Sequence, residues 1–213
     1  GQISDTGRII LEDSKEIDII DSQKYFLVLS DKNNTLQNII KGNDLIPVKG
    51  KVILDIKRRR AVERNHSATH LVHEALRRIL GSHVKQLGSL VHNEYLRFDF
   101  PHFHKLTDKE ILEIEKLVNL KIQEKIKVTT DVDISIDEAN RIPNVKKFFG
   151  EKYGEKVRVV HIDDNFSIEF CGGTHVKNTD DIGLFKIIKE ESIASGTRRI
   201  FARTGEGIVS YLN

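Results

Sequence analysis

The sequence predicts an α+β protein in which a small N-terminal β-barrel precedes a larger region of helices packed on a mostly antiparallel sheet. Three observations support this prediction. Residues 1–57 contain short apolar runs separated by turn-forming residues. Apolar residues recur at helical spacing after residue 65 and again after residue 107, and strand patterns return between residues 157 and 203. We therefore predict two domains, 1–57 and 58–213.

Composition limits the class of protein. The chain has 213 residues, of which 31% are charged and 38% hydrophobic, a balance typical of globular proteins. Its formal net charge of +2 excludes a strongly basic nucleic-acid coat but allows a local basic patch. We find no apolar run of the ~18 residues that a membrane span needs, and no signal peptide. The single cysteine excludes an internal disulfide, so we expect a reducing, cytoplasmic setting. Methionine is absent even at position 1, as expected of a segment cut from a longer protein.

The first region is predicted to be rich in strands. The runs 24–29 (KYFLVL) and 51–56 (KVILDI) have strand patterns, and turn-like stretches lie at 31–35, 41–44 and 49–50. A basic run, Lys57 to Arg60, follows. It is typical either of a solvated linker or helix start, or of a phosphate contact.

The second region begins with a predicted helix. Asn65 can cap its start and Gly81 can end it. One face is apolar, formed by Leu71, Val72, Ala75, Leu76, Ile79 and Leu80. Residues 88–100 then predict two strands around a turn at His92-Asn93.

Two further helices and four strands complete the prediction. Thr107 and Glu110 form a capping box that opens a helix reaching about Lys127. A shorter helix starts near Asp137 and is limited by Pro143. Strands are expected at 157–162, 167–170, 184–189 and 198–203.

Two histidines on the first predicted helix have the spacing of metal ligands. His66 and His70 are four residues apart, so both imidazoles project from one side, one turn apart. His73 lies near the same line, and helix geometry alone does not decide whether it joins them. Zinc proteases carry Glu after the first histidine as general base; Ser67 occupies that position here, which argues against a protease.

A second chemical motif is Cys171-Gly172-Gly173-Thr174-His175, which follows a predicted strand. The two glycines allow a sharp turn that brings the thiolate and the imidazole together. Three histidines and one cysteine form a plausible tetrahedral zinc set. The alternative is a nucleophile–base pair of Cys171 and one histidine, but that pair needs one orienting base rather than several neighbouring histidines.

The motifs together resemble the editing domain of alanyl-tRNA synthetase. The stretches that carry the resemblance are 64–91 (RNHSATHLVHEALRRILGSHVKQLGSLV), 149–160 (FGEKYGEKVRVV) and 171–200 (CGGTHVKNTDDIGLFKIIKEESIASGTRRI). The opening GQISDTGRI is similar to the start of the small barrel that precedes that domain, although only Gly1-Gln2 remain of the family's Gly-Gly-Gln. Free-standing trans-editing proteins share part of this set. The resemblance covers essentially the whole chain.

The resemblance implies a function and a set of residues. The zinc ligands are expected to be His66, His70, Cys171 and His175, with Gln86 and Cys171 as catalytic residues. The implied reaction hydrolyses the ester of serine, and of glycine, wrongly attached to the acceptor end of tRNA(Ala). The parent enzyme would use ATP to join alanine to tRNA, but nothing in this sequence corresponds to its adenylation core, so the rest of the synthetase is an expected partner. The basic residues that we expect to contact tRNA are Arg58, Arg59, Arg60, Arg198 and Arg199.

Two alternatives remain open from the sequence. In the first, zinc is structural and the chain is a tRNA-binding module without catalysis in isolation. In the second, the chain is a zinc hydrolase of a small ester or amide, which would act on substrates without tRNA. Four protein ligands close a tetrahedral zinc, whereas a catalytic zinc keeps one position open. The sequence therefore leaves the role of zinc, whether in activating water or in positioning substrate, undecided.

Overall fold

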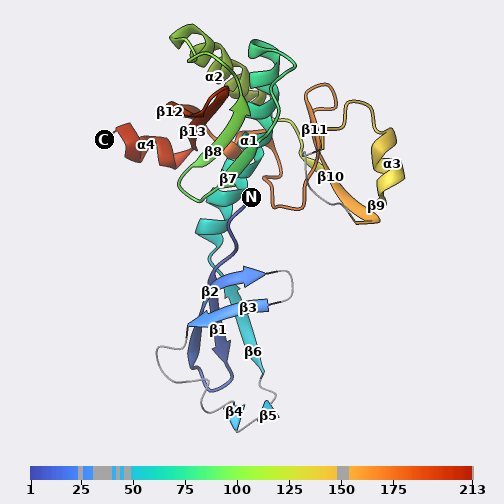
Figure 1. The fold of residues 1–213 in the computed structure, drawn as a ribbon. Helices are drawn as coiled ribbons and strands as arrows, with labels where there is room; N and C mark the ends of the chain where they lie inside the picture. Colours follow the sequence, from blue (N-terminus) through green and yellow to red (C-terminus); the bar gives the residue numbers. More distant parts are fainter. Residues whose placement is uncertain (24–25, 31–39, 42–43, 46–48, 148–153, 213) are drawn as a thin grey trace. The chain divides into compact units, whose positions relative to one another are not determined.

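A computed structural model describes residues 1–23, 26–30, 40–41, 44–45, 49–147 and 154–212 (Figure 1). The chain divides into two compact units. Residues 3–60 form one unit, and residues 1–2 together with 61–213 form the other. The division falls inside the first turns of a helix, close to the predicted domain boundary at 57/58, which stays a prediction.

The unit of residues 3–60 contains an antiparallel sheet with the strand order β3-β2-β1-β6. These strands are β1 (Gly7–Leu11), β2 (Glu16–Gln23), β3 (Phe26–Ser30) and β6 (Gly50–Leu54), and a short pair is formed by β4 (Ile40–Lys41) and β5 (Asp44–Leu45). Ile17 and Ile19 of β2 are buried. Within the described residues the sheet is open, so the predicted barrel is not confirmed. The predicted turn at 31–35, residues 24–25 of a predicted strand and residues 42–43 of another turn lie outside the described residues.

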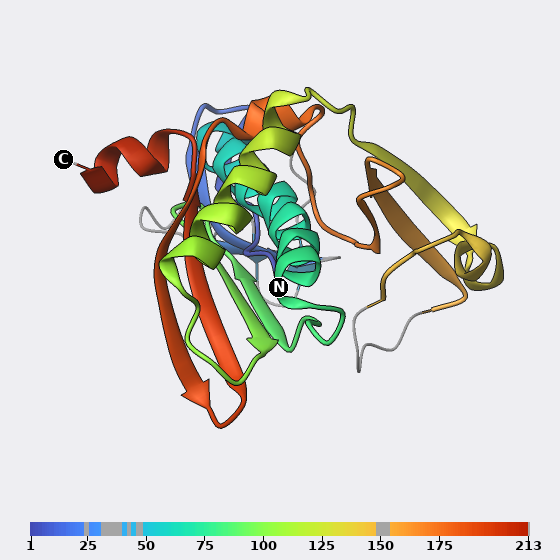
Figure 2. The same cartoon turned by 90° about the horizontal axis from the view of Figure 1, so that it is seen from above.

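The larger unit is built on a four-stranded antiparallel sheet. Its order is β12 (Phe185–Ala194), β13 (Thr197–Thr204), β8 (Leu96–Pro101) and β7 (Gly88–Val91). Two long helices, α1 (Ile56–Leu80) and α2 (Asp108–Gln123), lie side by side against this sheet (Figure 2). Helices on one antiparallel sheet confirm the predicted α+β class.

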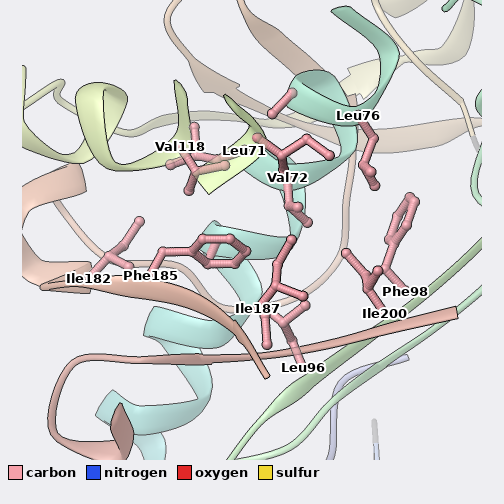
Figure 3. Close-up of a cluster of buried hydrophobic side chains, with 14 of the residues drawn as sticks. Leu71, Val72, Leu76, Leu96, Phe98, Val118, Ile182, Phe185, Ile187 and Ile200 are labelled. Atoms are coloured by element: carbon pink, nitrogen blue, oxygen red, sulfur yellow. The ribbon is translucent and has the colours of Figure 1, made fainter. Parts of the chain in front are cut away.

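The main hydrophobic core lies between these two helices and the sheet (Figure 3). Alternate residues of β8 point into it, because successive side chains of a strand face opposite sides. Ile200 and Ala202 of β13 lie on the same face. The labelled members are Leu71, Val72, Leu76, Leu96, Phe98, Val118, Ile182, Phe185, Ile187 and Ile200.

A second sheet of three antiparallel strands carries the other half of the site. Its order is β11 (Ser167–Phe170), β10 (Lys156–Ile162) and β9 (Thr129–Ser135). Helix α3 (Ile136–Arg141) follows β9 directly in the chain. A smaller core cluster, with Val159 and Phe170 buried at its centre, packs α3 on this sheet. A 3-10 turn (Thr179–Ile182) and α4 (Glu206–Leu212) complete the unit. No helix in the described part of the chain combines the length and the apolar character that crossing a membrane requires.

Several predicted boundaries were wrong for local reasons. Helix α1 begins at Ile56 rather than at Asn65, because Asp55 caps it by accepting from the Arg58 backbone N–H at 2.9 Å. Asn65 instead lies buried inside the helix, where its side chain bonds to the His92 carbonyl and to Thr204. The predicted capping box of α2 is confirmed, but the helix ends at Gln123.

Other elements carried weaker local signals. Helix α3 starts from a second capping box, Ser135 with Glu138, just before the predicted start. Strands β1, β2 and β9 and helix α4 were not predicted. The strands predicted at 157–162, 167–170, 184–189 and 198–203 are confirmed, as is the end of α1 at Gly81, whose φ is +122°.

Candidate metal centre

Helix α1 presents two histidines on one face. His66 and His70 are one turn apart, and their rings stack with centroids 5.2 Å apart and 24° between planes. His70 is buried and His66 is half-buried. The pair therefore lies at the edge of the core with the geometry that its spacing predicts.

The turn that follows β11 supplies two more donor groups. The Cys171 backbone N–H donates to the Arg158 carbonyl on β10 at 3.1 Å. The Arg158 guanidinium donates in return to the carbonyls of Gly172 and Gly173, at 2.8 and 3.2 Å. Arg158 of β10 thereby holds the turn in place, and the side chain of His175 lies beside that of Cys171.

The four side chains form one cluster. Cys171 Sγ lies 3.3 Å from Nε2 of His66 and 3.3 Å from Nε2 of His175, and the donor atoms of all four residues lie within 4.8 Å of one another. Around a tetrahedral zinc, sulfur and nitrogen ligands lie about 3.5 Å apart, given Zn–S and Zn–N distances of about 2.3 and 2.0–2.1 Å. The donor set and its spacing fit that ion, so this cluster could hold a metal.

Each histidine of the cluster has an oxygen atom at its other ring nitrogen. Gln2 Oε1 lies 2.8 Å from Nδ1 of His66, and Glu169 Oε2 lies 2.7 Å from Nδ1 of His70. Ser67 Oγ lies 3.1 Å from Nδ1 of His175. Such outer contacts orient imidazole ligands and leave Nε2 for the metal.

The electrostatics of the cluster favour a thiolate. Burial opposes ionisation of Cys171, but the charges of His66 and His70 and hydrogen bonds from His175 and His66 outweigh it and lower the pKa of the thiol to about 2. The pKa of His70 rises to about 10: burial opposes the rise, and the Glu169 and Cys171 charges outweigh it. Burial lowers the pKa of His175 to about 3. Cys171 and His175 are thus in the thiolate and neutral-imidazole forms that bind metal ions, whereas His70 must release its proton when it binds one.

Three members of the cluster, His66, His70 and Cys171, form part of the wall of a cavity of about 620 Å³. Gln86, which lies between α1 and β7, is in the same wall. Three basic residues also line the cavity: Arg97, Lys156 and Arg158. Among the described residues of the lining none is acidic. The cavity therefore suits an anionic molecule.

The structure separates His73 from the cluster. Its Nδ1 lies 3.2 Å from Glu169 Oε1, and its ring is buried against Phe98. It shares with His70 the Glu169 carboxylate, which also accepts from Ser167 Oγ and Lys146. The spacing in the sequence did not decide whether His73 is a metal ligand. In the structure it contacts Glu169, the carboxylate that also contacts His70, and does not join the four donor groups.

The arginines predicted to contact tRNA are not among the described residues that line the cavity, and four of them make contacts within the fold. Arg199 makes a two-pronged ion pair with Asp99, its register partner on β8, at 2.7 and 2.8 Å, and Arg198 pairs with Glu190. In the smaller unit Arg59 pairs with Asp5 at 3.0 Å and Arg58 donates to the Ser4 carbonyl. Arg60 is exposed. Their role in RNA binding stays a prediction.

Two important residues were missed in the sequence. Glu169 is a charged residue inside the apolar strand SIEF, a signal that marks a buried carboxylate with partners. Gln2 carries no such signal, because it lies 64 positions before the histidine that it contacts.

Comparisons with known proteins agree with these motifs. Residues 157–201 match the family model described as the threonyl and alanyl tRNA synthetase second additional domain. The chain is 45% identical over 208 residues to an alanine–tRNA ligase of Cytophaga hutchinsonii, covering 96% of this chain and 22% of that protein. It is 46% identical to those of Haemophilus influenzae and Pseudothermotoga lettingae, covering 100% of this chain and 24% of each.

The chain thus spans about a quarter of the length of the curated relatives it matches. The match runs over the whole chain, and it includes both halves of the histidine and cysteine cluster. The chain is therefore similar, along its whole length, to a segment of alanine–tRNA ligases, and its residues 157–201 match the second additional domain of threonyl and alanyl tRNA synthetases.

Proposed function

We propose that this chain hydrolyses the ester bond of tRNA(Ala) that carries serine or glycine in place of alanine. Water adds to the ester carbonyl, the bond to the ribose oxygen breaks, and free amino acid and tRNA are released. The single observation that carries the proposal is the open, basic cavity beside the histidine and cysteine cluster. A purely structural metal site needs no such cavity.

The need for such a reaction follows from the limits of recognition. A pocket that accepts alanine rejects the smaller glycine weakly, and an apolar pocket rejects an added hydroxyl only about 100-fold. A second site that destroys wrong products supplies the remaining selectivity. The relatives are named as ligases of alanine and tRNA, which is consistent with a segment dedicated to such proofreading.

We propose zinc as the metal of the cluster, held by His66, His70, Cys171 and His175. When bound, zinc supplies a Lewis acid that polarises a carbonyl or lowers the pKa of water. Gln86 is the proposed positioning group for water or substrate, because its amide both donates and accepts and it lies in the wall of the same cavity. Cys171 contributes its thiolate to the metal.

Basic residues around the site are proposed to hold the acceptor end of the tRNA. Arg97, Lys156 and Arg158 line the cavity itself. Gln86 also lines a second cavity of about 640 Å³, where five basic residues face two acidic ones among the described lining: Arg77, Arg78, Lys85, Lys146 and Lys147 against Glu74 and Asp164. Single-stranded RNA ends are bound through such phosphate contacts. Arg58, Arg59, Arg60, Arg198 and Arg199 are retained as further candidates.

We assign the ligation of alanine to tRNA with ATP to segments of the ligases that this chain does not match. The chain covers 22–24% of those proteins, so most of each relative lies outside the comparison. The remainder of a synthetase is accordingly a proposed partner, and a cytoplasmic location goes with that proposal.

A second candidate function is a tRNA-binding module with a structural zinc. The four protein donors of the cluster favour it, since closed tetrahedral sites with four protein ligands are typical of structural zinc. It predicts the same ligands but no hydrolysis by the chain alone.

The test is deacylation of Ser-tRNA(Ala) by the full chain, with Ala-tRNA(Ala) measured in parallel. We expect loss of serine but not of alanine, and loss of activity in Cys171→Ala and in Gln86→Ala. Zinc content, measured for each variant, separates the two: Cys171→Ala loses the metal and Gln86→Ala keeps it. Intact zinc and tRNA binding without any hydrolysis would support the binding module instead.

A further inference from the structure

The residue of interest is Gln2, at the start of the chain. Its backbone forms a parallel bridge with Val91 at the end of β7, and the Val91 N–H donates to the Gly1 carbonyl at 3.0 Å. Gln2 belongs to the same compact unit as the cluster and lines the cavity beside it. Residues 3–60 form the other unit. In the sequence, the whole of that other unit thus lies between Gln2 and the first residue of the cluster.

The Gln2 side chain joins the two halves of the cluster. Its Oε1 accepts from the Thr174 backbone N–H at 2.9 Å and lies 2.8 Å from Nδ1 of His66. Its Nε2 donates to Thr174 Oγ1 at 3.0 Å. A backbone N–H can only donate, so the contact with Thr174 fixes which end of the amide is the oxygen. One side chain therefore holds both helix α1 and the Cys171–His175 turn.

This orientation has a consequence for His66. An amide oxygen only accepts, so Nδ1 of His66 carries the proton and donates it to Gln2. The other nitrogen, Nε2, lies 3.3 Å from Cys171 Sγ and is then the one left to bind the metal. We propose that Gln2 is a positioning residue of the metal centre, which fixes the ring of His66 and docks the turn that carries Cys171 and His175.

Close packing supports this assignment. A Cβ atom on Gly173 would lie 2.1 Å from His66 Cε1 and 2.6 Å from Gln2 Oε1. Gly173 therefore lies close to both the His66 ring and the Gln2 amide, with no room for a side chain at position 173. The inference rests on the metal site proposed above, but it does not depend on any hydrolysis.

The test measures zinc affinity of the full chain by competition with a chelating dye, without tRNA. Outer-shell substitutions typically weaken metal binding 10–100-fold. We expect Gln2→Ala to raise the zinc Kd about 10-fold or more, and Gln2→Glu to stay within about threefold because its carboxylate still accepts from both donors. Gln123→Ala, an exposed glutamine at the end of α2, serves as the matched control and stays unchanged.

Two spectroscopic measurements add to the affinity. In the cobalt-loaded protein, Gln2→Ala is expected to shift the visible ligand-field bands, and Gln2→Glu to restore them. In the cadmium-loaded wild-type protein, nitrogen NMR is expected to place the metal on Nε2 of His66 and a slowly exchanging proton on Nδ1. Wild-type affinity in Gln2→Ala, or equal weakening in Gln2→Ala and Gln2→Glu, overturns the proposal. Should Gln2→Ala fail to fold, metal on Nδ1 of wild-type His66 overturns it alone.

Discussion

At the scale of single residues, the two glycines between Cys171 and His175 differ in their surroundings. A Cβ on Gly173 would lie 2.1 Å from His66 Cε1 and 2.5 Å from its Nδ1, whereas a Cβ on Gly172 would meet nothing within 4 Å. Neither has the positive φ that would itself require glycine. The need for glycine at 173 comes from the close approach of a ring, which adjacent sequence letters cannot reveal.

This difference makes a paired prediction. Gly173→Ala is expected to displace His66 and to weaken zinc binding about 10-fold or more, by analogy with the loss of an orienting contact. Gly172→Ala is expected to bind zinc as the wild type does. Titration calorimetry on the metal-free proteins compares them, and equal affinities would contradict the geometry.

At the scale of elements, helix α2 covers the edge strand β12 with side chains as well as with its apolar face. Asn119 accepts from the Phe185 N–H at 2.9 Å and donates to the Phe185 carbonyl at 2.9 Å. Glu115 accepts from the Ile187 N–H at 2.8 Å. Three polar backbone groups near the start of this edge strand are thereby satisfied, which is one way in which proteins protect edge strands.

Removal of the Asn119 amide tests this contact between helix and strand. Asn119→Ala leaves the Phe185 N–H and carbonyl without these partners at a buried residue, and we expect a loss of about 1–3 kcal/mol in the free energy of unfolding. Lys116→Ala, at an exposed position of the same helix, should change it by less than about 0.5 kcal/mol. Urea unfolding measures both, and similar losses in the two variants would refute the role.

The capping box of α2 makes a prediction about pH. Hydrogen bonds from the Thr107 backbone and side chain lower the pKa of Glu110 in the folded protein. A carboxyl with a lowered folded pKa stabilises above its unfolded pKa, and the stabilisation is lost as pH falls through the folded value. We expect Glu110→Gln to destabilise the protein at pH 7 by up to about 1 kcal/mol, since the group is solvent-screened. The difference should shrink toward pH 3; a constant difference would contradict the assignment.

At the scale of the whole molecule, the cluster joins parts of the chain about a hundred positions apart. His66 and His70 come from α1, and Cys171 and His175 from the turn after β11. A metal that binds only the folded arrangement stabilises it by mass action.

Zinc is therefore expected to stabilise the protein against unfolding. At a free concentration of 100 times its Kd the gain should be about 2.7 kcal/mol. A chelator should remove it, and Cys171→Ala should show none. His161→Ala is the control, since this histidine contacts Asp131 and Asp164 outside the cluster. Urea unfolding with and without zinc gives the comparison, and no gain in the wild type would contradict the metal site.

The sequence by itself determined the features that depend on neighbouring residues. The capping box at Thr107 and Glu110, the end of α1 at Gly81 and the alternating strands of the second region were predicted and are confirmed. The two histidines of α1 and the Cys171 turn were also found by spacing, because one helical turn and one tight turn set their geometry locally. Their identity as zinc ligands stays a prediction.

The tertiary structure alone decided the features that depend on distant partners. Asn65 is buried within α1, where it bonds to the His92 carbonyl, and His73 contacts Glu169. Arg199 pairs with Asp99 because the register of β13 and β8 places these two residues opposite each other. The tertiary structure also brought Gln2 to His66. Each of these contacts joins residues 27 or more positions apart. The polarity of such a side chain indicates that it requires a hydrogen-bond or ion-pair partner, but only the packing of the folded chain determines which residue is that partner.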